Sequence, residues 1–360
     1  MEGTNWTNEA SGNIAPVWAE VMQNAAPNPE DEVKAAKKHF SKLGLMFFLG
    51  TLCIYAVQLI PMGIVDLLNP ELFDNPTFSI LLGMVPMYLV GIPLLSFFVK
   101  RVPATPIERH HMKGGHFILA VFISYAVMIV SNIVGVIITF IIGILKGGLV
   151  ENALASATDS VNIAVLFIIT VLCAPPIEEY VFRKLLVERA VRYGQVAAVL
   201  LSGLMFGLFH GNLNQFVYAF TLGVFLAFLY VKTGKLKITI GIHMIVNFIG
   251  TIASVLVLDL FDFEGYNEVV QSMDYGVMMD FYMQNLVPML IMMLFGVAVF
   301  GMVVTGIVLL IVALVKRRFT FAQGQVVLPK GKRFTTIIVN VGMMLYCIFW
   351  IVMIIIQLFT

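Results

Sequence analysis

The chain has 360 residues, of which 60% are hydrophobic and only 12% are charged. A soluble globular protein carries roughly 25% charged residues, so this composition excludes a soluble domain and a disordered chain. The 22 basic residues nearly balance the 21 acidic ones, and the net charge of +1 gives no field that would attract a nucleic acid. Because the apolar residues stand in long runs, the sequence predicts an all-α, polytopic membrane protein.

Nine apolar segments are long enough to cross about 30 Å of hydrocarbon at 1.5 Å per residue, and we expect them to form a transmembrane helical bundle. The fifth and sixth segments are short and are separated only by Gly211–Asn214, which predicts a tight helical hairpin. The nine segments cover residues 43–66, 77–99, 116–145, 161–182, 196–212, 215–231, 238–257, 287–315 and 335–359.

The basic residues give the bundle an orientation. All but one of them lie before the first span or in every second loop after it, and these segments share one side of the membrane. That side holds 21 of the 22 basic residues, and only Lys146 lies on the other side. The positive-inside rule then places the N-terminus in the cytoplasm and the C-terminus outside. We expect the polar tail 1–42, with its basic juxtamembrane segment, to be cytoplasmic. Residues 258–286, which contain acids but no Lys or Arg, should form an outer loop, and an ordinary acidic loop is preferred over an interfacial cap.

Charged side chains within a membrane span need a reason, because each costs roughly 2.5–3.5 kcal/mol at the centre of a helix. Glu178 and Glu179 follow Pro175 and Pro176 in the fourth span. Glu179 and Arg183 are four residues apart and can form an ion pair on one helix face. Glu178 lies about 100° around the helix and has no such partner in the sequence, so its carboxylate is available. The alternative is that both acids only mark the cytoplasmic end of the helix.

Two histidines and an asparagine lie within the neighbouring spans. Phe206 and His210 share a helix face, as do His243 and Asn247. Each pair alone is typical of hydrogen bonding between membrane helices. Together with the free Glu178, however, these intramembrane polar groups on neighbouring spans favour a functional site.

In order along the chain, these residues resemble the motifs of the intramembrane proteases grouped as CAAX prenyl proteases and bacteriocin-processing enzymes, the CPBP family. Its pattern is EExxxR, then FxxxH, then HxxxN or HxxxB, and this chain has Glu178-Glu179 with Arg183, Phe206 with His210, and His243 with Asn247. The resemblance covers residues 160–255, which we expect to be the catalytic core. Residues 43–150 and 287–360 would then be accessory spans, and Lys184 stands where the family often has Gly.

The resemblance implies an intramembrane endopeptidase that cleaves a membrane-associated protein or peptide. It implies that Glu178 and His210 activate a water molecule and that His243 and Asn247 stabilise the oxyanion. The rival interpretation is a zinc site made by Glu178, His210 and His243, since two histidines and a glutamate suit Zn²⁺. There is no HExxH, and the histidines lie on different helices, so we favour the metal-free mechanism without a cofactor.

Two other function classes stay open at this point. A transporter would use Glu178 and His210 as a proton relay, but it would prefer two repeated halves, and only one proline-broken site is present. A membrane immunity or binding protein would keep the fold and hold a partner without catalysis. Nothing marks a eukaryotic chain, so we expect a multi-pass protein of a bacterial plasma membrane.

Overall fold

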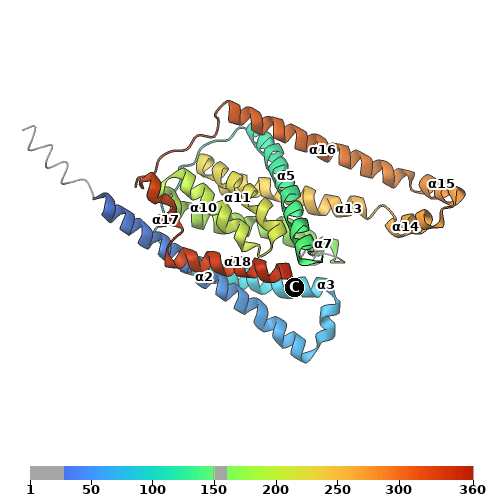
Figure 1. Cartoon of the computed structure of the whole chain (residues 1–360), viewed down its shortest axis with the longest axis horizontal. Helices are drawn as coiled ribbons and strands as arrows, with labels where there is room; N and C mark the ends of the chain where they lie inside the picture. Colours follow the sequence, from blue (N-terminus) through green and yellow to red (C-terminus); the bar gives the residue numbers. More distant parts are fainter. Residues whose placement is uncertain (1–27, 149, 151–159, 360) are drawn as a thin grey trace, which may run out of the picture.

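The computed structural model describes residues 28–148, 150 and 160–359, and the regular structure in these ranges is entirely helical (Figure 1). This confirms the predicted all-α polytopic bundle. Most of the predicted N-terminal tail, residues 1–27, lies outside the described residues.

Eight helical stretches of the described chain are long and apolar enough to cross a membrane. The fifth of the nine predicted segments is not among them, because its helix is shorter. There, α10 (Gln195–Phe209) has only 15 residues, and at 1.5 Å per residue it reaches about 22 Å, too short to cross the hydrocarbon alone. The eight stretches are α2 (Pro29–Leu68), Pro76–Val99, α5 (Gly114–Lys146), Ile163–Tyr193, α11 (Leu213–Thr233), Leu236–Leu258, α16 (Leu286–Val315) and α18 (Val341–Phe359).

Some of the long stretches change helix type along their length. Pro76–Val99 consists of α3 (Pro76–Pro86), the π-helical η2 (Met87–Gly91) and α4 (Ile92–Val99), and it follows the short 3₁₀ helix η1 (Pro70–Asp74). Leu236–Leu258 consists of α12 (Leu236–Asn247), the π-helical η6 (Phe248–Ala253) and α13 (Ser254–Leu258).

The stretch Ile163–Tyr193, which carries the acidic motif, is the most divided. Its first half contains α7 (Ile163–Phe167), the π-helical η3 (Ile168–Cys173) and α8 (Ala174–Glu179). Pro175 and Pro176 have no amide hydrogen, so the carbonyl groups one turn earlier lose their helical donors. The wider π turn stands at that place, as is frequent near functional sites. The second half contains the π-helical η4 (Tyr180–Val187), α9 (Glu188–Ala190) and the 3₁₀ helix η5 (Val191–Tyr193).

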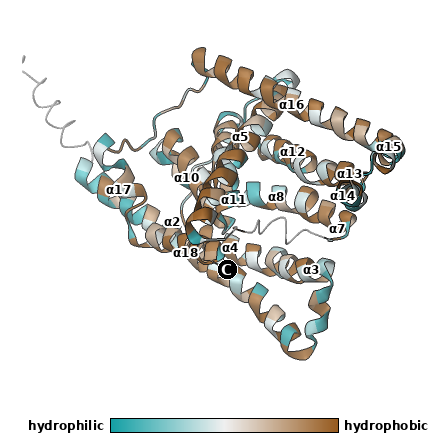
Figure 2. Ribbon diagram, turned by 45° about the vertical axis from the view of Figure 1, so that its right-hand side comes forward, coloured by the Kyte–Doolittle hydropathy of each residue, from teal (hydrophilic) through white to brown (hydrophobic). Residues whose placement is uncertain are grey.

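The short helix α10 lies inside the bundle and packs against α11 as the predicted hairpin (Figure 1). Glycine permits this close approach, because a Cβ atom on Gly207 would lie 2.9 Å from the carbonyl oxygen of Phe216. On the edges of the bundle, α2 packs against α18, and α5 packs against α16. Figure 2 shows these helices made largely of hydrophobic residues. Many of their large apolar side chains are exposed, as expected of surfaces that contact lipid.

The acidic segment 258–286 is more ordered than the preferred loop interpretation suggested. It contains α14 (Phe263–Ser272) and α15 (Tyr275–Gln284), which are capped by the side chains of Asp262 and Asp274. The rings of Phe261 and Phe281 pack with their centroids 5.9 Å apart. The remaining short elements, η7 (Lys330–Lys332) and α17 (Arg333–Ile337), precede α18 at the other end of the molecule.

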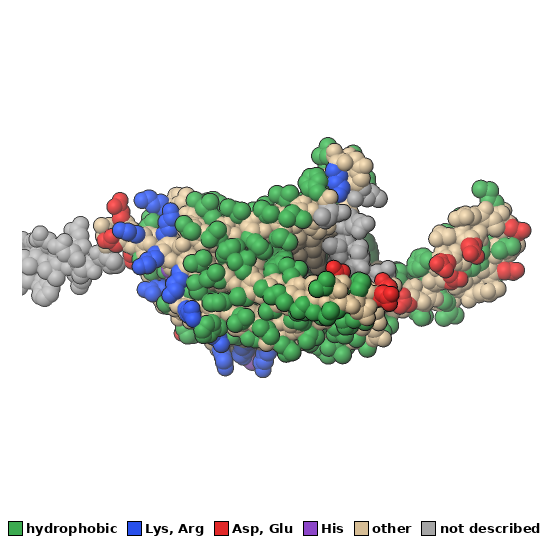
Figure 3. Space-filling view, turned by 90° about the horizontal axis from the view of Figure 1, so that it is seen from below, with side chains coloured by type: hydrophobic (Ala, Val, Ile, Leu, Met, Phe, Trp, Pro, Cys, Tyr) green, Lys and Arg blue, Asp and Glu red, His purple; other side chains and the backbone are tan. Residues whose placement is uncertain are grey.

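The charged side chains separate along the bundle. Figure 3 shows most of the visible Lys and Arg near the end where α2 begins, beside a small group of acids, and most of the visible Asp and Glu toward the opposite end, with a largely apolar face between them. By the positive-inside rule, the end that is rich in Lys and Arg is expected to face the cytoplasm. The cytoplasmic position of the basic end remains a prediction.

We predict that reporter domains fused after Thr360 and inserted within 316–333 will lie on opposite sides of the membrane, with the insertion in the cytoplasm. The physical reason is the concentration of basic residues at one end of the bundle. Accessibility of each reporter to a membrane-impermeant reagent in intact cells measures this. A C-terminal reporter on the same side as the 316–333 insertion would contradict the predicted topology.

Candidate active site

The candidate residues lie where the stretch Ile163–Tyr193 meets α10 and α12. The depth of α10 depends on how far the preceding helix runs. Helical structure continues to Tyr193, and Gly194, with φ of 115°, turns the chain directly into α10. His210 follows the last residue of α10, so the hairpin turn places it at the depth of the acidic motif.

Glu179 and Arg183 form the predicted ion pair, and both side chains are fully buried, with 0% exposure. Arg183 Nε donates to Glu179 Oε2 at 3.0 Å, and Nη2 donates to Oε1 at 3.1 Å. This two-point geometry is the strongest that an arginine and a carboxylate can form. Arg183 Nη1 also donates to Ser202 Oγ on α10 at 2.7 Å, and Ser202 donates to the carbonyl oxygen of Phe182 at 2.8 Å.

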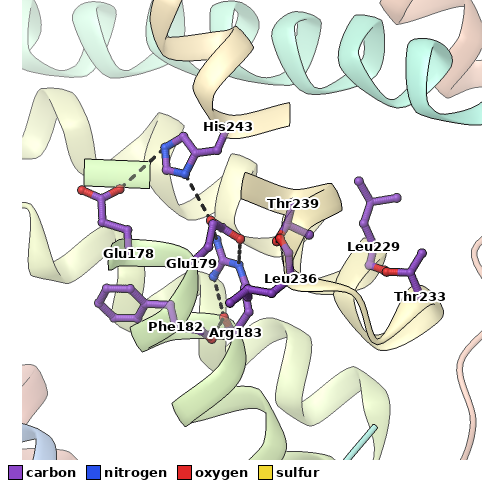
Figure 4. Close-up of polar contacts among 10 residues, drawn as sticks. Glu178, Glu179, Phe182, Arg183, Leu229, Thr233, Leu236, Thr239 and His243 are labelled. Atoms are coloured by element: carbon purple, nitrogen blue, oxygen red, sulfur yellow. Dashed lines mark hydrogen bonds and ion pairs between the residues drawn. The ribbon is translucent and has the colours of Figure 1, made fainter. Parts of the chain in front are cut away.

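His243 on α12 contacts both glutamates from the opposite side (Figure 4). Its Nδ1 atom lies 3.1 Å from Glu179 Oε1, and its Nε2 atom lies 3.6 Å from Glu178 Oε2. Since the Glu179 carboxylate is paired with Arg183 and only accepts hydrogen bonds, Nδ1 of His243 must carry a proton. Thr239, one turn earlier on α12, donates its hydroxyl hydrogen to the carbonyl oxygen of Leu236 at 3.0 Å. Both oxygens of the Glu179 carboxylate therefore have partners, from Arg183 and His243.

Glu178 lies in a different environment from its neighbour. Its side chain is 22% exposed, and its contact with His243 is longer than a hydrogen bond. No other ion pair involves Glu178 within residues 28–148, 150 and 160–359. The structure thus holds one carboxylate of the pair rigidly and leaves the adjacent one open.

Phe206 holds the two histidines in place. Its ring meets those of His210 and His243 edge to face, with centroids 4.8 Å and 5.9 Å away, and the guanidinium of Arg183 lies 5.1 Å from its centroid. His210 Nδ1 lies 2.9 Å from the carbonyl oxygen of Phe206. A carbonyl only accepts, so Nδ1 donates, and Nε2 of the neutral ring has a free lone pair.

Asn247 is the least tightly connected of the predicted site residues. Its amide Nδ2 donates to the carbonyl oxygen of Thr170 at 2.9 Å, in the π-helical turn before the prolines. An amide nitrogen carries two hydrogens, so one remains for another acceptor. Asn247 and His243 both contact the stretch Ile163–Tyr193, as their spacing on one helix face predicted.

Several polar residues around the site were missing from the sequence prediction. Ser202 stands four residues before Phe206, and Thr239 stands four before His243, so extending each motif by one helical turn would have found both. Tyr218 gives no such signal. It accepts a hydrogen bond from Gln215 at 2.9 Å and its ring lies 6.5 Å from that of His210, but it stands on α11, outside the three motifs.

The zinc alternative concerns Glu178, His210 and His243. Glu179 orients His243 through Nδ1, which is an arrangement often found behind a metal-binding histidine. However, the described part of the chain contains no group of three His, Cys, Asp or Glu side chains close enough together to hold a metal ion.

We predict that Glu179→Gln and Arg183→Ala will each destabilise the protein by about 3–5 kcal/mol, because each leaves a buried charge without its partner. Glu178→Gln is the matched control. It removes the same charge from the neighbouring residue, whose side chain is partly exposed, and it should keep the wild-type melting temperature. Thermal unfolding in detergent measures the three variants. Equal loss of melting temperature in Glu178→Gln and Glu179→Gln would contradict the assignment.

The comparison with known proteins concerns this same region. Residues 160–249 match the family described as Type II CAAX prenyl endopeptidase Rce1-like. No curated protein and no solved structure matches the chain. The match spans the helices that carry the candidate residues, so this region of the chain is similar to the Rce1-like type II CAAX prenyl endopeptidases.

Proposed function

We propose that the chain hydrolyses a peptide bond of a membrane-associated protein or peptide, using Glu178 and His210 to activate water and His243 with Asn247 to stabilise the oxyanion. The observation that carries this proposal is the contrast between the adjacent glutamates. Glu179 is fully buried and bound to Arg183 and His243, whereas the Glu178 side chain is 22% exposed. A general base must reach water, and only Glu178 meets this condition.

The proposed first step is attack by water. The Glu178 carboxylate accepts one proton from the water molecule while the water oxygen bonds to the carbonyl carbon of the substrate. The free Nε2 lone pair of His210 accepts the other hydrogen of the water as a hydrogen bond and orients it. The carbonyl oxygen then carries a negative charge. When the C–N bond breaks, Glu178 returns its proton to the leaving amine, so the carboxylate is restored.

The oxyanion needs donors that are already in place. In the proposed mechanism His243 is an imidazolium whose Nδ1–H is held by Glu179, so its Nε2–H points toward Glu178 and the reacting group. The 3.6 Å separation from Glu178 leaves that hydrogen uncommitted. The second amide hydrogen of Asn247 is the other donor. The buried ion pair thus positions the imidazole without taking part in proton transfer.

The membrane-spanning helices and the Rce1-like domain support a membrane-associated substrate and a lipid environment. A membrane protein that only binds a partner would use the same fold without needing an open carboxylate. Loss of cleavage in a folded Glu178 variant separates these two functions.

We predict that Glu178→Gln will fold like the wild type and have almost no proteolytic activity, because glutamine cannot accept the proton from water. Asn247→Ala should retain weak activity, about 10²–10³-fold below wild type, since it loses one of two oxyanion donors. Cleavage of a membrane-embedded reporter peptide in proteoliposomes measures both, with circular dichroism as the control for folding. Wild-type activity in Glu178→Gln would refute the mechanism.

We further predict that the purified protein holds no tightly bound metal and that its activity survives a strong chelator. Elemental analysis of protein purified without chelator should give less than about a tenth of an equivalent of zinc, because His210 and His243 lie on different helices and no group of three His, Cys, Asp or Glu side chains in the described chain is placed to hold the ion. About one zinc per chain, lost in both His210→Ala and His243→Ala, would instead favour the metalloprotease alternative.

A further inference from the structure

A second candidate binding site lies at the basic end of the bundle, away from the candidate active site. A groove of about 360 Å³ opens between α2 and the break that separates α17 from α18. Its α2 wall is polar, and its opposite wall is largely apolar. The groove is lined by Lys34, Lys37, Lys38, Ser41, Val339, Asn340, Val341 and Met344.

The lysines share one face of α2. Lys34, Lys37, Lys38 and Ser41 follow the spacing of three, four and seven residues that brings side chains together on a helix. None of the three lysines forms an ion pair with another described residue. Figure 3 shows this end of the molecule rich in Lys and Arg. The groove therefore presents uncompensated positive charge.

The opposite wall of the groove continues into a surface suited to hydrocarbon. Val341 is 72% exposed and Met344 is 42% exposed, although both belong to an apolar helix. The exposed side chains of Leu345 and Ile348 extend the same stripe along α18. A ligand that fits both walls must have an anionic head and an apolar tail.

We infer that this groove binds an anionic phospholipid, with the phosphate held by the lysines and one acyl chain lying along Val341, Met344 and Ile348. The groove stands where α2 passes from its charged first turns to its apolar sequence, which is the level of lipid headgroups. Gly342 N donates to Ser41 Oγ at 3.2 Å, so the Ser41 hydroxyl hydrogen is free to donate to a phosphate oxygen.

Acidic residues restrict where the headgroup sits. Glu30, Asp31 and Glu32 occupy the first turn of α2, before the lysine face begins. They repel a phosphate at the far end of that face. The phosphate therefore lies against Lys37, Lys38 and Ser41, at the end next to the apolar wall. This site is independent of the proposed proteolysis, and its failure would leave that proposal unchanged.

The test uses the full chain in detergent, titrated with phosphatidylglycerol or phosphatidylcholine, with bound lipid counted by native mass spectrometry. We expect preferential binding of phosphatidylglycerol. In the triple variant Lys34→Gln, Lys37→Gln, Lys38→Gln its apparent affinity should fall by about tenfold or more. The matched control, Lys113→Gln, Lys235→Gln, Lys237→Gln, removes the same charge elsewhere on the basic side and should bind like the wild type.

Met344→Trp tests the apolar wall separately, because it fills the groove and keeps every lysine. It should weaken phosphatidylglycerol binding while the melting temperature without lipid stays unchanged. Three results would overturn the inference: equal binding of the two lipids, equal loss in the two triple variants, or displacement of the lipid by glycerol phosphate at similar concentration. The last result would indicate a site for soluble anions.

Discussion

The buried ion pair between Glu179 and Arg183 is the interaction on which the candidate site depends. Two charges out of water are costly, and the pair is tolerated only because the carboxylate and guanidinium are satisfied by further hydrogen bonds. Those bonds reach Ser202 on α10 and His243 on α12, so the pair joins three helical segments. An apolar pair of the same size would pack these helices but would not orient an imidazole.

This arrangement also explains why two glutamates stand side by side. Consecutive residues on a helix point about 100° apart, so one acid faces the centre of the helix junction and the other lies at its edge. Glu179 takes the junction and is fully buried, whereas Glu178 keeps part of its surface open. His243 lies between them and contacts one carboxylate with each ring nitrogen. The division of roles therefore follows from helix geometry and from the position of α12.

Much of this was predictable from the sequence because it depends on local spacing. Glu179 with Arg183 and Phe206 with His210 are four residues apart, and both contacts are present. The long apolar runs likewise predicted the all-α bundle. Contacts between helices were not predictable, since no spacing relates His243 to Glu178 or Asn247 to Thr170. The fifth predicted span, α10, is shorter than the others, which the sequence did not reveal for a physical reason: hydropathy identifies an apolar segment, but it does not show how long the helix in that segment is.

A helix too short to cross the membrane needs other helices to fix its depth, and α10 is held from two sides. Its glycines allow α11 to approach closely, and on the other side the hydroxyl of Tyr346 on α18 donates to the carbonyl oxygen of Met205 at 2.8 Å. The rings of Phe209 and Trp350 add a second contact, with centroids 5.2 Å apart. Met205 directly precedes Phe206 in the sequence, and Phe209 directly precedes His210. The helix α18, outside residues 160–249, therefore helps to hold the segment of α10 that carries Phe206 and precedes His210.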